Sequence, residues 1–194
     1  MCRGVGHTWD DGLLSNVKTR IINVEKRLFK IIVNDLIFAL VFFLVLYFAF
    51  WPYRVQGDSM MDTLRTGDRI ITSKIEFYLN IFDRGSLMVV NIMQDGVERR
   101  AVKRLVGLPG DRVDIEEGRL YVNGNLVEEP YLKASGAADY HGDQHVALGR
   151  DEYFFMGDNR ADSFDSRDAG PAKKSDIICK VLIKFYPFVQ MRIY

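Results

Sequence analysis

An uncharged apolar stretch near the N-terminus constrains this chain more than any other feature. No charged residue occurs from Leu36 to Tyr53, and nearly every residue from Leu36 to Phe50 is apolar or aromatic. A membrane-spanning helix needs ~17–25 such residues, so this stretch is short, and we expect residues 31–34 to extend it into the headgroup layer. A buried core helix would show a polar face, which this stretch lacks. The sequence therefore predicts a transmembrane anchor over residues 34–53.

The charges ahead of the anchor predict its orientation. Basic residues outnumber acidic ones there, with Arg3, Lys18, Arg20, Lys26, Arg27 and Lys30 against Asp10, Asp11 and Glu25. The positive-inside rule makes residues 1–33 a cytoplasmic N-terminal tail and residues 54–194 an extracytoplasmic domain.

The end of the anchor favours one uncleaved span in the cell membrane. Trp51 and Tyr53 suit the far membrane interface, and Pro52 would end the helix. A cleaved secretory signal needs small residues at its cleavage site, whereas residues 48–51 are mostly bulky.

Composition narrows the possible functions. Basic and acidic residues number 26 each, which argues against nucleic acid as a partner. Cys2 and Cys179 are predicted on opposite sides of the membrane, so no disulfide is expected between them.

The region after the anchor has the pattern of an antiparallel, mainly β domain. Short runs rich in β-branched residues, bounded by Gly, Asp or Asn, occur at 69–72, 87–90, 100–106, 112–115 and 120–122. Asn123-Gly124 predicts a hairpin turn, and residues 133–150 predict a surface loop, so residues 111–150 form a hairpin and loop insertion. Only residues 73–79 resemble a helix, and residues 180–194 resemble a closing strand pair.

Three sequence blocks carry the chemistry: Val55–Leu64 with Ser59, Lys103–Asp111 with Lys103, and Gly157–Arg167. A serine nucleophile needs a base, but His7 is predicted to be cytoplasmic and His141 and His145 fall in the loop. Lys103 is the remaining candidate, although a free lysine is neutral only about once in 2,500 molecules at pH 7. Burial on its apolar strand would lower its pKa, whereas a solvent-facing strand position would not.

Together the three blocks resemble the type I signal peptidases, in the shorter, single-anchor Gram-positive-like branch. This resemblance implies a barrel-like antiparallel β-sheet catalytic domain behind one transmembrane helix. It also implies a serine endopeptidase without cofactor or metal, in which Ser59 is the nucleophile and Lys103 the general base. The substrates would be secretory preproteins whose signal peptides are cut after small residues in an Ala-x-Ala pattern, at the surface of the membrane lipid.

The same resemblance assigns supporting residues. Ser163 would orient Lys103, and two structural ion pairs would join Asp158 to Arg104 and Asp165 to Arg167. Gly57 would serve the oxyanion hole or would be only a turn glycine. Val55 and Val102 would line the pockets for the small substrate residues, or they would be ordinary core valines.

Some features leave alternatives open. Asp62 stands where the family usually has proline, and its charge lies three residues from the nucleophile, which puts the rate in question. A catalytically silent homologue that helps to assemble surface proteins is the alternative to a peptidase. His141 and His145 near Asp143 are not expected to hold a metal, and the oligomeric state stays open.

Overall fold

The computed structural model describes residues 10–61, 63–132 and 142–194, and it divides into two units, residues 1–48 and 49–194. The described part of the first unit belongs to helix α1 (Asp10–Ala49), whose last residue falls in the second unit. Within its segment Ile22–Ala49, which is long enough to cross a membrane, a stretch of 18 residues reaches a mean hydropathy of 2.6. The apolar side chains of this segment are largely exposed, as a lipid-facing helix requires.

The boundaries of the apolar helix differ from the prediction of residues 34–53. The helix starts well before residue 34, and it ends at Ala49 because the next five residues form strand β1 (Phe50–Arg54). Each residue of β1 pairs with strand β2 (Arg69–Ser73), from Phe50 opposite Ser73 to Arg54 opposite Arg69. Pro52 is tolerated because β1 is an edge strand. Trp51 and Tyr53 therefore belong to the second unit's sheet and not to the end of the helix.

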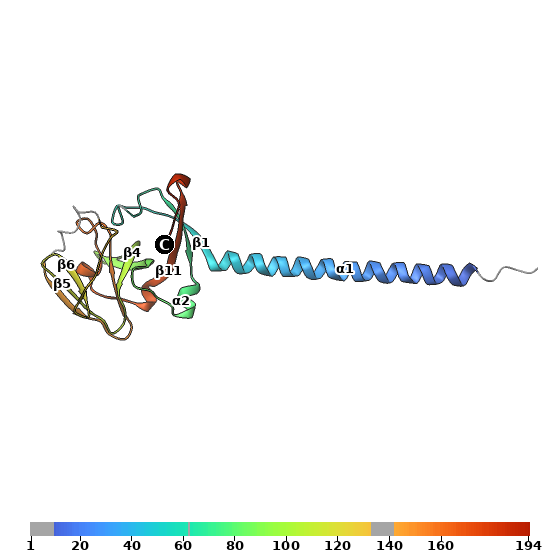
Figure 1. Ribbon diagram of the computed structural model, residues 1–194, viewed down its shortest axis with the longest axis horizontal. Coiled ribbons are helices and arrows are strands. Elements are labelled where there is room, and N and C mark those ends of the chain that lie inside the picture. The colour runs from blue at the N-terminus through green and yellow to red at the C-terminus, as the bar shows by residue number, and fades with distance from the viewer. Residues whose placement is uncertain (1–9, 62, 133–141) are drawn as a thin grey trace, which may run out of the picture. The chain divides into compact units, whose positions relative to one another are not determined.

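The second unit contains an antiparallel sheet in the order β1-β2-β11-β3-β4-β9-β10, with β12 added beside β11. Strands β1, β11 and β4 of this sheet are labelled in Figure 1. Its further strands are β3 (Leu87–Gln94), β4 (Val97–Gly107), β9 (Glu152–Met156), β10 (Ala172–Lys173), β11 (Ile177–Tyr186) and β12 (Arg192–Ile193). Strand β4 pairs with β3 along residues 97–104, but with β9 only from Arg104 onward. Within the described part of the chain, the other edge of β4 from Val97 to Lys103 thus has no strand partner.

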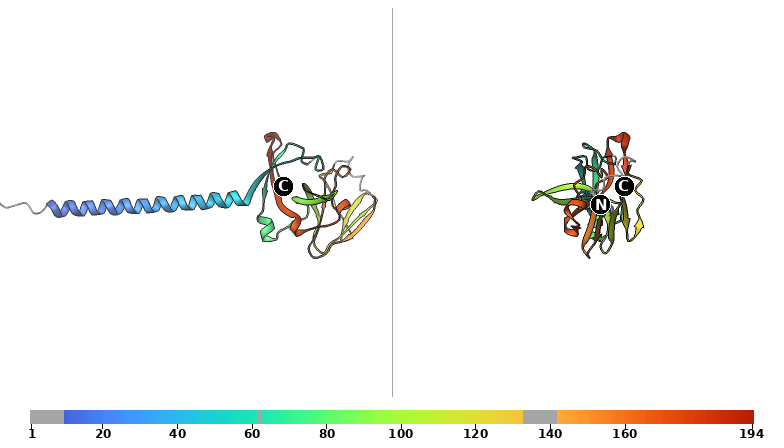
Figure 2. Two further views of the ribbon diagram at one scale, coloured as in Figure 1. Left: turned by 180° about the vertical axis from the view of Figure 1, so that it is seen from behind. Right: turned by 90° about the vertical axis from the view of Figure 1, so that its left-hand side faces the viewer.

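A smaller antiparallel sheet has the order β7-β6-β5-β8 and lies on the side of the unit away from β1 (Figures 1 and 2). Its strands are β5 (Arg112–Glu116), β6 (Arg119–Val122), β7 (Asn125–Leu126) and β8 (Gln144–Ala147). Asn123 and Gly124 form the predicted turn with φ values of 53° and 77°. Apolar residues of β5 and β6 pack on Phe154 and Met156 of the large sheet in one core cluster. The mainly β, antiparallel fold preceded by an apolar helix is therefore confirmed.

The predicted loop 133–150 is wrong for residues 144–147, because β8 pairs with β5. The side chain of Val146 packs against the core cluster while His145 stays exposed, so this short strand has only one core residue to signal it. Residues 133–141, including His141, lie outside the described residues. The helical elements of the second unit are α2 (Ile75–Leu79), α3 (Ser166–Ala169) and the 3₁₀ turns η1 (Lys174–Asp176) and η2 (Phe188–Gln190).

Candidate active site

Ser59 lies half-buried in a tight turn that follows β1. The turn is anchored by Met60 and Leu64, whose side chains are buried in a core cluster with Ile70 and Leu87. The amide N–H of Leu64 donates to the carbonyl of Met60 at 2.7 Å. From the third motif, Asn159 donates its backbone N–H to the Ser59 carbonyl at 3.0 Å. Its side-chain Nδ2 also donates to the Asp58 carbonyl at 3.1 Å, so Asn159 fixes the main chain on which Ser59 sits.

Lys103 is buried near the end of the unpaired edge of β4, with 2% of its surface exposed. Its Nζ donates to Ser163 Oγ at 2.8 Å. Burial lowers the pKa of Lys103 to about 8, although the negative charge of Asp165 acts in the opposite direction. With a pKa of about 8, about a tenth of the lysines are neutral at pH 7. The alternative of a solvent-facing lysine is therefore wrong for Lys103.

Ser163 links Lys103 to a buried carboxylate. Its hydroxyl donates to Asp165 Oδ2 at 2.7 Å, so a lone pair of the same oxygen accepts from Lys103. Arg167 donates to both oxygens of Asp165 at 2.9 Å, and the Gly157 N–H donates to it at 2.8 Å. Burial alone would raise the pKa of Asp165, but these partners hold it below its usual value. An ionised Asp165 thus sets the direction of both hydrogen bonds and holds the lysine amine in place.

Gly157 lies in a space that admits no side chain. A Cβ at this position would lie 2.5 Å from the Ser59 carbonyl oxygen and equally close to Ser163 Cβ. Real Cβ atoms do not approach backbone atoms so closely. The first residue of the third motif is therefore a glycine because the nucleophile turn and Ser163 both pack against its backbone.

The other predicted ion pair joins Arg104 to Asp158. Arg104 Nε lies 2.7 Å from Asp158 Oδ1, and Arg104 Nη2 lies 2.5 Å from Oδ2. Thr63 Oγ1, in the nucleophile turn, donates to the same carboxylate at 2.5 Å. Asp158 therefore joins the turn that carries Ser59 to the strand that carries Lys103, and sequence reasoning had missed Thr63 in this role.

A second buried ion pair was also missed. The fully buried Arg160 donates to both oxygens of Glu129, at 3.0 and 2.5 Å, and its Nε donates to the Gly157 carbonyl at 3.0 Å. Tyr131 donates its hydroxyl to Glu129 at 2.7 Å, and the Arg104 guanidinium lies 3.7 Å from the centre of the Tyr131 ring. Arg160 belongs to the third motif, but no sequence spacing links it to Glu129.

Ser59 and Lys103 line the same cavity of about 280 Å³. Gly57 lines it too, with a φ of 86° that favours glycine, and its carbonyl accepts from Thr66 Oγ1 at 3.0 Å. Val55 and Val102 do not line this cavity; they belong to the core cluster of Met60 and Leu64. Asp62 lies outside the described residues. The remaining lining residues are Asp58, Ile92, Gln94, Arg99, Arg100, Ala101, Asp162 and Phe164.

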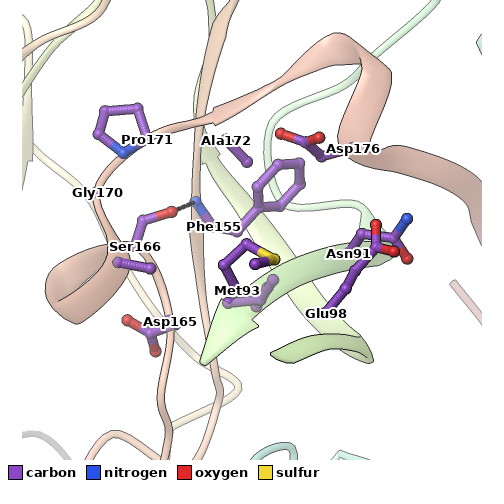
Figure 3. A pocket seen from close by; sticks show the side chains of 12 residues that line it. Asn91, Met93, Glu98, Phe155, Asp165, Ser166, Gly170, Pro171, Ala172 and Asp176 are labelled. Carbon is purple, nitrogen blue, oxygen red and sulfur yellow. Dashed lines mark hydrogen bonds between the residues drawn. The ribbon is translucent and has the colours of Figure 1, made fainter. Parts of the chain in front are cut away.

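A smaller cavity of about 150 Å³ lies beside Asp165, between β3, α3 and β10 (Figure 3). Phe155, Met93 and Pro171 give it apolar walls. Ser166 Oγ at its edge accepts the backbone N–H of Phe155 at 3.0 Å. The cavity is thus lined by Asp165, which holds Lys103 in place through Ser163, but neither Ser59 nor Lys103 lines it.

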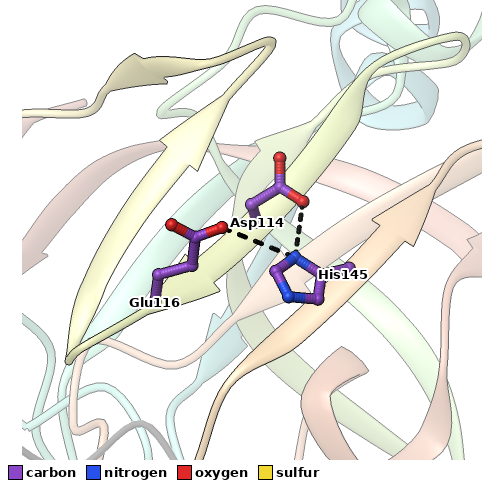
Figure 4. A group of neighbouring side chains, drawn as sticks. All are labelled: Asp114, Glu116 and His145. Carbon is purple, nitrogen blue, oxygen red and sulfur yellow. Dashed lines mark hydrogen bonds and ion pairs between the residues drawn. The ribbon is translucent and has the colours of Figure 1, made fainter.

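His145 lies away from the cavity, in a group with Asp114 and Glu116 on the small sheet (Figure 4). Its Nδ1 is 2.8 Å from Asp114 Oδ1, and Arg112 Nε is 2.9 Å from both oxygens of Asp114. The hydrogen bond to His145, with that to Arg112, lowers the pKa of Asp114. Asp143 instead accepts the Glu117 N–H at 3.0 Å, so the grouping of His145 with Asp143 considered from the sequence does not form. The observed group joins His145 to Asp114 and Glu116, and Asp114 also forms an ion pair with Arg112.

Comparison with known proteins identifies the family. The family model described as "Signal peptidase, peptidase S26" matches residues 27–186. The chain is 37% identical to signal peptidase I U of Bacillus subtilis, over 91% of this chain and 98% of that protein. It is 41% identical to signal peptidase I S of Bacillus subtilis, over 75% of this chain and 82% of that protein.

Among solved structures, the chain is similar to a signal peptidase I from Enterococcus faecalis. The identity is 27% and the TM-score 0.45, over 51% of this chain and 95% of that one. The family match and the Bacillus relatives confirm the resemblance seen in the three motifs. The chain belongs to the signal peptidase family, peptidase S26, and is a serine peptidase.

Proposed function

We propose that this protein is a membrane-anchored signal peptidase I that removes signal peptides from exported preproteins with a Ser59–Lys103 dyad. The observation that carries the proposal is the state of Lys103: it is buried, its pKa is lowered to about 8, and it lines one cavity with Ser59. A lysine in this state can be neutral often enough to act as a base near neutral pH.

In the first step, Ser59 Oγ attacks the carbonyl carbon of the scissile bond and its proton passes to the neutral amine of Lys103. The hydrogen bond from Lys103 to Ser163 occupies one N–H of this amine and leaves its lone pair available to the nucleophile. Backbone N–H groups near Ser59 would stabilise the oxyanion, and Gly57 leaves room for the substrate carbonyl.

The tetrahedral intermediate then collapses with cleavage of the C–N bond, and protonated Lys103 gives its proton to the leaving amine of the mature protein. The signal peptide stays attached to Ser59 as an ester. Water attacks this ester, Lys103 takes the proton of the water, and the proton returns to Ser59 Oγ as the ester bond breaks. Serine and lysine are regenerated, so the cycle requires no cofactor.

The unpaired edge of β4 suggests how the substrate is held. Residues 97–103 have no strand partner on that edge within the described chain, and their last residue is Lys103. An extended peptide could pair with this edge as an additional strand and place its scissile bond at the dyad. Val55 and Val102 belong to the core cluster of Met60, and the neighbours of Val102, Ala101 and Lys103, line the cavity. Their branched side chains would limit pocket depth and favour alanine at the two recognition positions.

Helix α1 supports the membrane location. We infer a single-pass protein whose N-terminus is cytoplasmic and whose second unit is extracytoplasmic, because basic residues predominate ahead of the apolar segment. This orientation would expose the dyad on the side where the cleavage site of an exported chain emerges.

The test is cleavage of a preprotein with an Ala-x-Ala site by the full-length protein in liposomes. Wild type should cut after the second alanine, and Ser59→Ala and Lys103→Met should each abolish cleavage while keeping the wild-type melting temperature. Lys180→Met is the matched control, because Lys180 lies on β11 and forms an exposed ion pair with Asp83. An active Lys103→Met variant would overturn the dyad. An inactive wild type would favour the silent assembly-factor alternative, which the relatives do not support.

A further inference from the structure

A buried ion pair that the mechanism above does not use lies at the base of the loop that carries Ser59. Lys184 Nζ, on β11, lies 2.8 Å from Asp68 Oδ2, and each of the two residues is only 5% exposed. Lys184 Nζ also donates to Gln190 Oε1 at 3.2 Å. Burying two charges is costly, and such a pair contributes little net stability. The place of this pair in the fold is therefore more informative than its energy.

Asp68 closes the nucleophile loop, the name we give to residues 55–68. The backbone N–H of Val55 donates to the carbonyl of Asp68 at 2.8 Å, and that of Gly67 donates to the carbonyl of Val55 at 3.0 Å. The carboxylate of Asp68 accepts the backbone N–H of Arg65 at 2.9 Å. The two ends of the loop therefore meet at a residue of the buried ion pair.

Tyr194, the residue after β12, contacts the nucleophile loop at a second point. Its hydroxyl donates to the carbonyl of Thr63 at 3.1 Å, and its backbone N–H donates to the carbonyl of Leu182 on β11 at 2.9 Å. Its side chain packs against the core cluster that includes Met60. Because the Thr63 hydroxyl donates to Asp158, Thr63 is held from two sides.

Strand β11 also connects the nucleophile loop to the strand that carries the base. Lys180 of β11 lies opposite Met88 of β3, and Met88 lies opposite Lys103 of β4. A reacting group on a loop is held precisely only where packed elements support it. One strand thus reaches Lys103 through its sheet neighbours and the loop of Ser59 through its Lys184 side chain.

We propose that Lys184 and Tyr194 are positioning residues that hold the nucleophile loop against β11, so that Ser59 Oγ stays within reach of the Lys103 amine. The proposal rests on the Ser59–Lys103 dyad proposed above. Neither Lys184 nor Tyr194 lines the cavity, so each acts through the loop and not on the substrate. Their loss should therefore lower kcat and leave KM unchanged.

Lys184→Met tests the ion pair with a short water-soluble peptide as the substrate. Displacements of about 1 Å at a reacting centre cost about 100-fold in rate. Because Asn159 and Asp158 still hold the loop, we expect kcat to fall about tenfold, with KM within about twofold of wild type. Lys180→Met is the matched control on the same strand, where the ion pair with Asp83 is exposed, and it should keep the wild-type kcat.

A double-mutant cycle tests whether Lys184 acts through Asp68. Asp68→Asn removes the charge but keeps an acceptor for the Arg65 N–H, and it should lower kcat by a factor similar to that of Lys184→Met. The double variant should be no slower than either single variant, because both changes break the same pair. Losses that multiply would overturn an action through the ion pair.

Tyr194→Phe removes only the hydroxyl that donates to Thr63. Loss of this one hydrogen bond should lower kcat about fivefold, again without a change in KM. The contacts of Lys103 with Ser163 stay intact, so the pH at which kcat/KM levels off should remain that of wild type in every variant.

Each variant is assayed at a temperature at which circular dichroism shows it fully folded. A wild-type kcat in Lys184→Met and Tyr194→Phe would overturn the proposal, as would a rise in KM at constant kcat, which would indicate a contact with the substrate. A kcat that falls only with the folded fraction would show a role in stability alone and would also overturn it. If wild type does not cleave the peptide, the dyad on which the proposal rests has failed.

Discussion

Lys103 is the residue whose ionisation should set the pH dependence of the reaction. Its neutral amine is the reactive form, and burial lowers its pKa to about 8. Below that pH the amine is increasingly protonated, so kcat/KM should rise about tenfold per pH unit up to about pH 8 and level off above it. The measurement is a pH profile with a soluble peptide substrate. A profile that is flat across this range would contradict the assignment of Lys103 as the base.

Substitution of Asp165 provides a second test of Lys103 as the base. Its charge raises the pKa of Lys103 against the effect of burial, so Asp165→Asn should move the acid limb of the profile to lower pH. The plateau rate should fall as well, because Ser163 and Arg167 lose a charged partner. Asp151→Asn, at an exposed turn before β9, should leave both values unchanged. A lower plateau with an unmoved limb would mean that Asp165 acts on folding alone.

Gly157 should tolerate no substitution. In Gly157→Ala the new methyl group would overlap the Ser59 carbonyl and Ser163. The turn that carries Ser59 and the Ser163 side chain that holds Lys103 must then move apart. Displacements of about 1 Å at a reacting centre cost about 100-fold in rate, and we expect kcat to fall by at least that factor. Gly149→Ala is the control, because its methyl group would meet only the flexible Glu152 side chain. Wild-type kcat in Gly157→Ala would contradict the close packing.

The site was predictable from sequence where one motif contains both partners, or where two motifs meet. Ser163, Asp165 and Arg167 lie within five positions, and the Arg104–Asp158 pair joins two recognised blocks. Thr63 and Glu129 were missed because each lies far from its partner in the sequence and meets it only in the folded protein. A lysine on an apolar strand can lie on either face of the sheet, so the burial of Lys103 could not be predicted from the sequence and became evident only in the structure.

At the level of elements, the segment after β7 ties the small sheet to the third motif through Glu129. Glu129→Gln would remove the charge that pairs with the fully buried Arg160, and breaking a buried pair costs about 3–5 kcal/mol. The free energy of unfolding should fall by that order, as measured by denaturant titration in detergent. Glu128→Gln alters the exposed neighbour and should have almost no effect. Equal stability of the two variants would show that the pair contributes nothing.

The strands were easier to predict than the ends of the elements. β2, β5 and β6 coincide with runs rich in β-branched residues between turn residues, and such local patterns can be recognised in the sequence alone. The helix end was misplaced because Phe50–Arg54 is as apolar and aromatic as the helix before it, and only pairing with β2 makes it a strand. β8 was missed because four residues with one inward side chain give almost no alternation.

At the scale of the whole molecule, the charge asymmetry around α1 predicts which side of the membrane each unit occupies. In intact cells, a membrane-impermeant thiol reagent should label Leu126→Cys, an exposed position on β7, but not Cys2 in the N-terminal tail. Both should react once the membrane is permeabilised, and Cys179 should stay unlabelled because it is buried. Labelling of Cys2 from outside would reverse the orientation. It would also place the Ser59–Lys103 cavity in the cytoplasm, where it could not meet an exported preprotein.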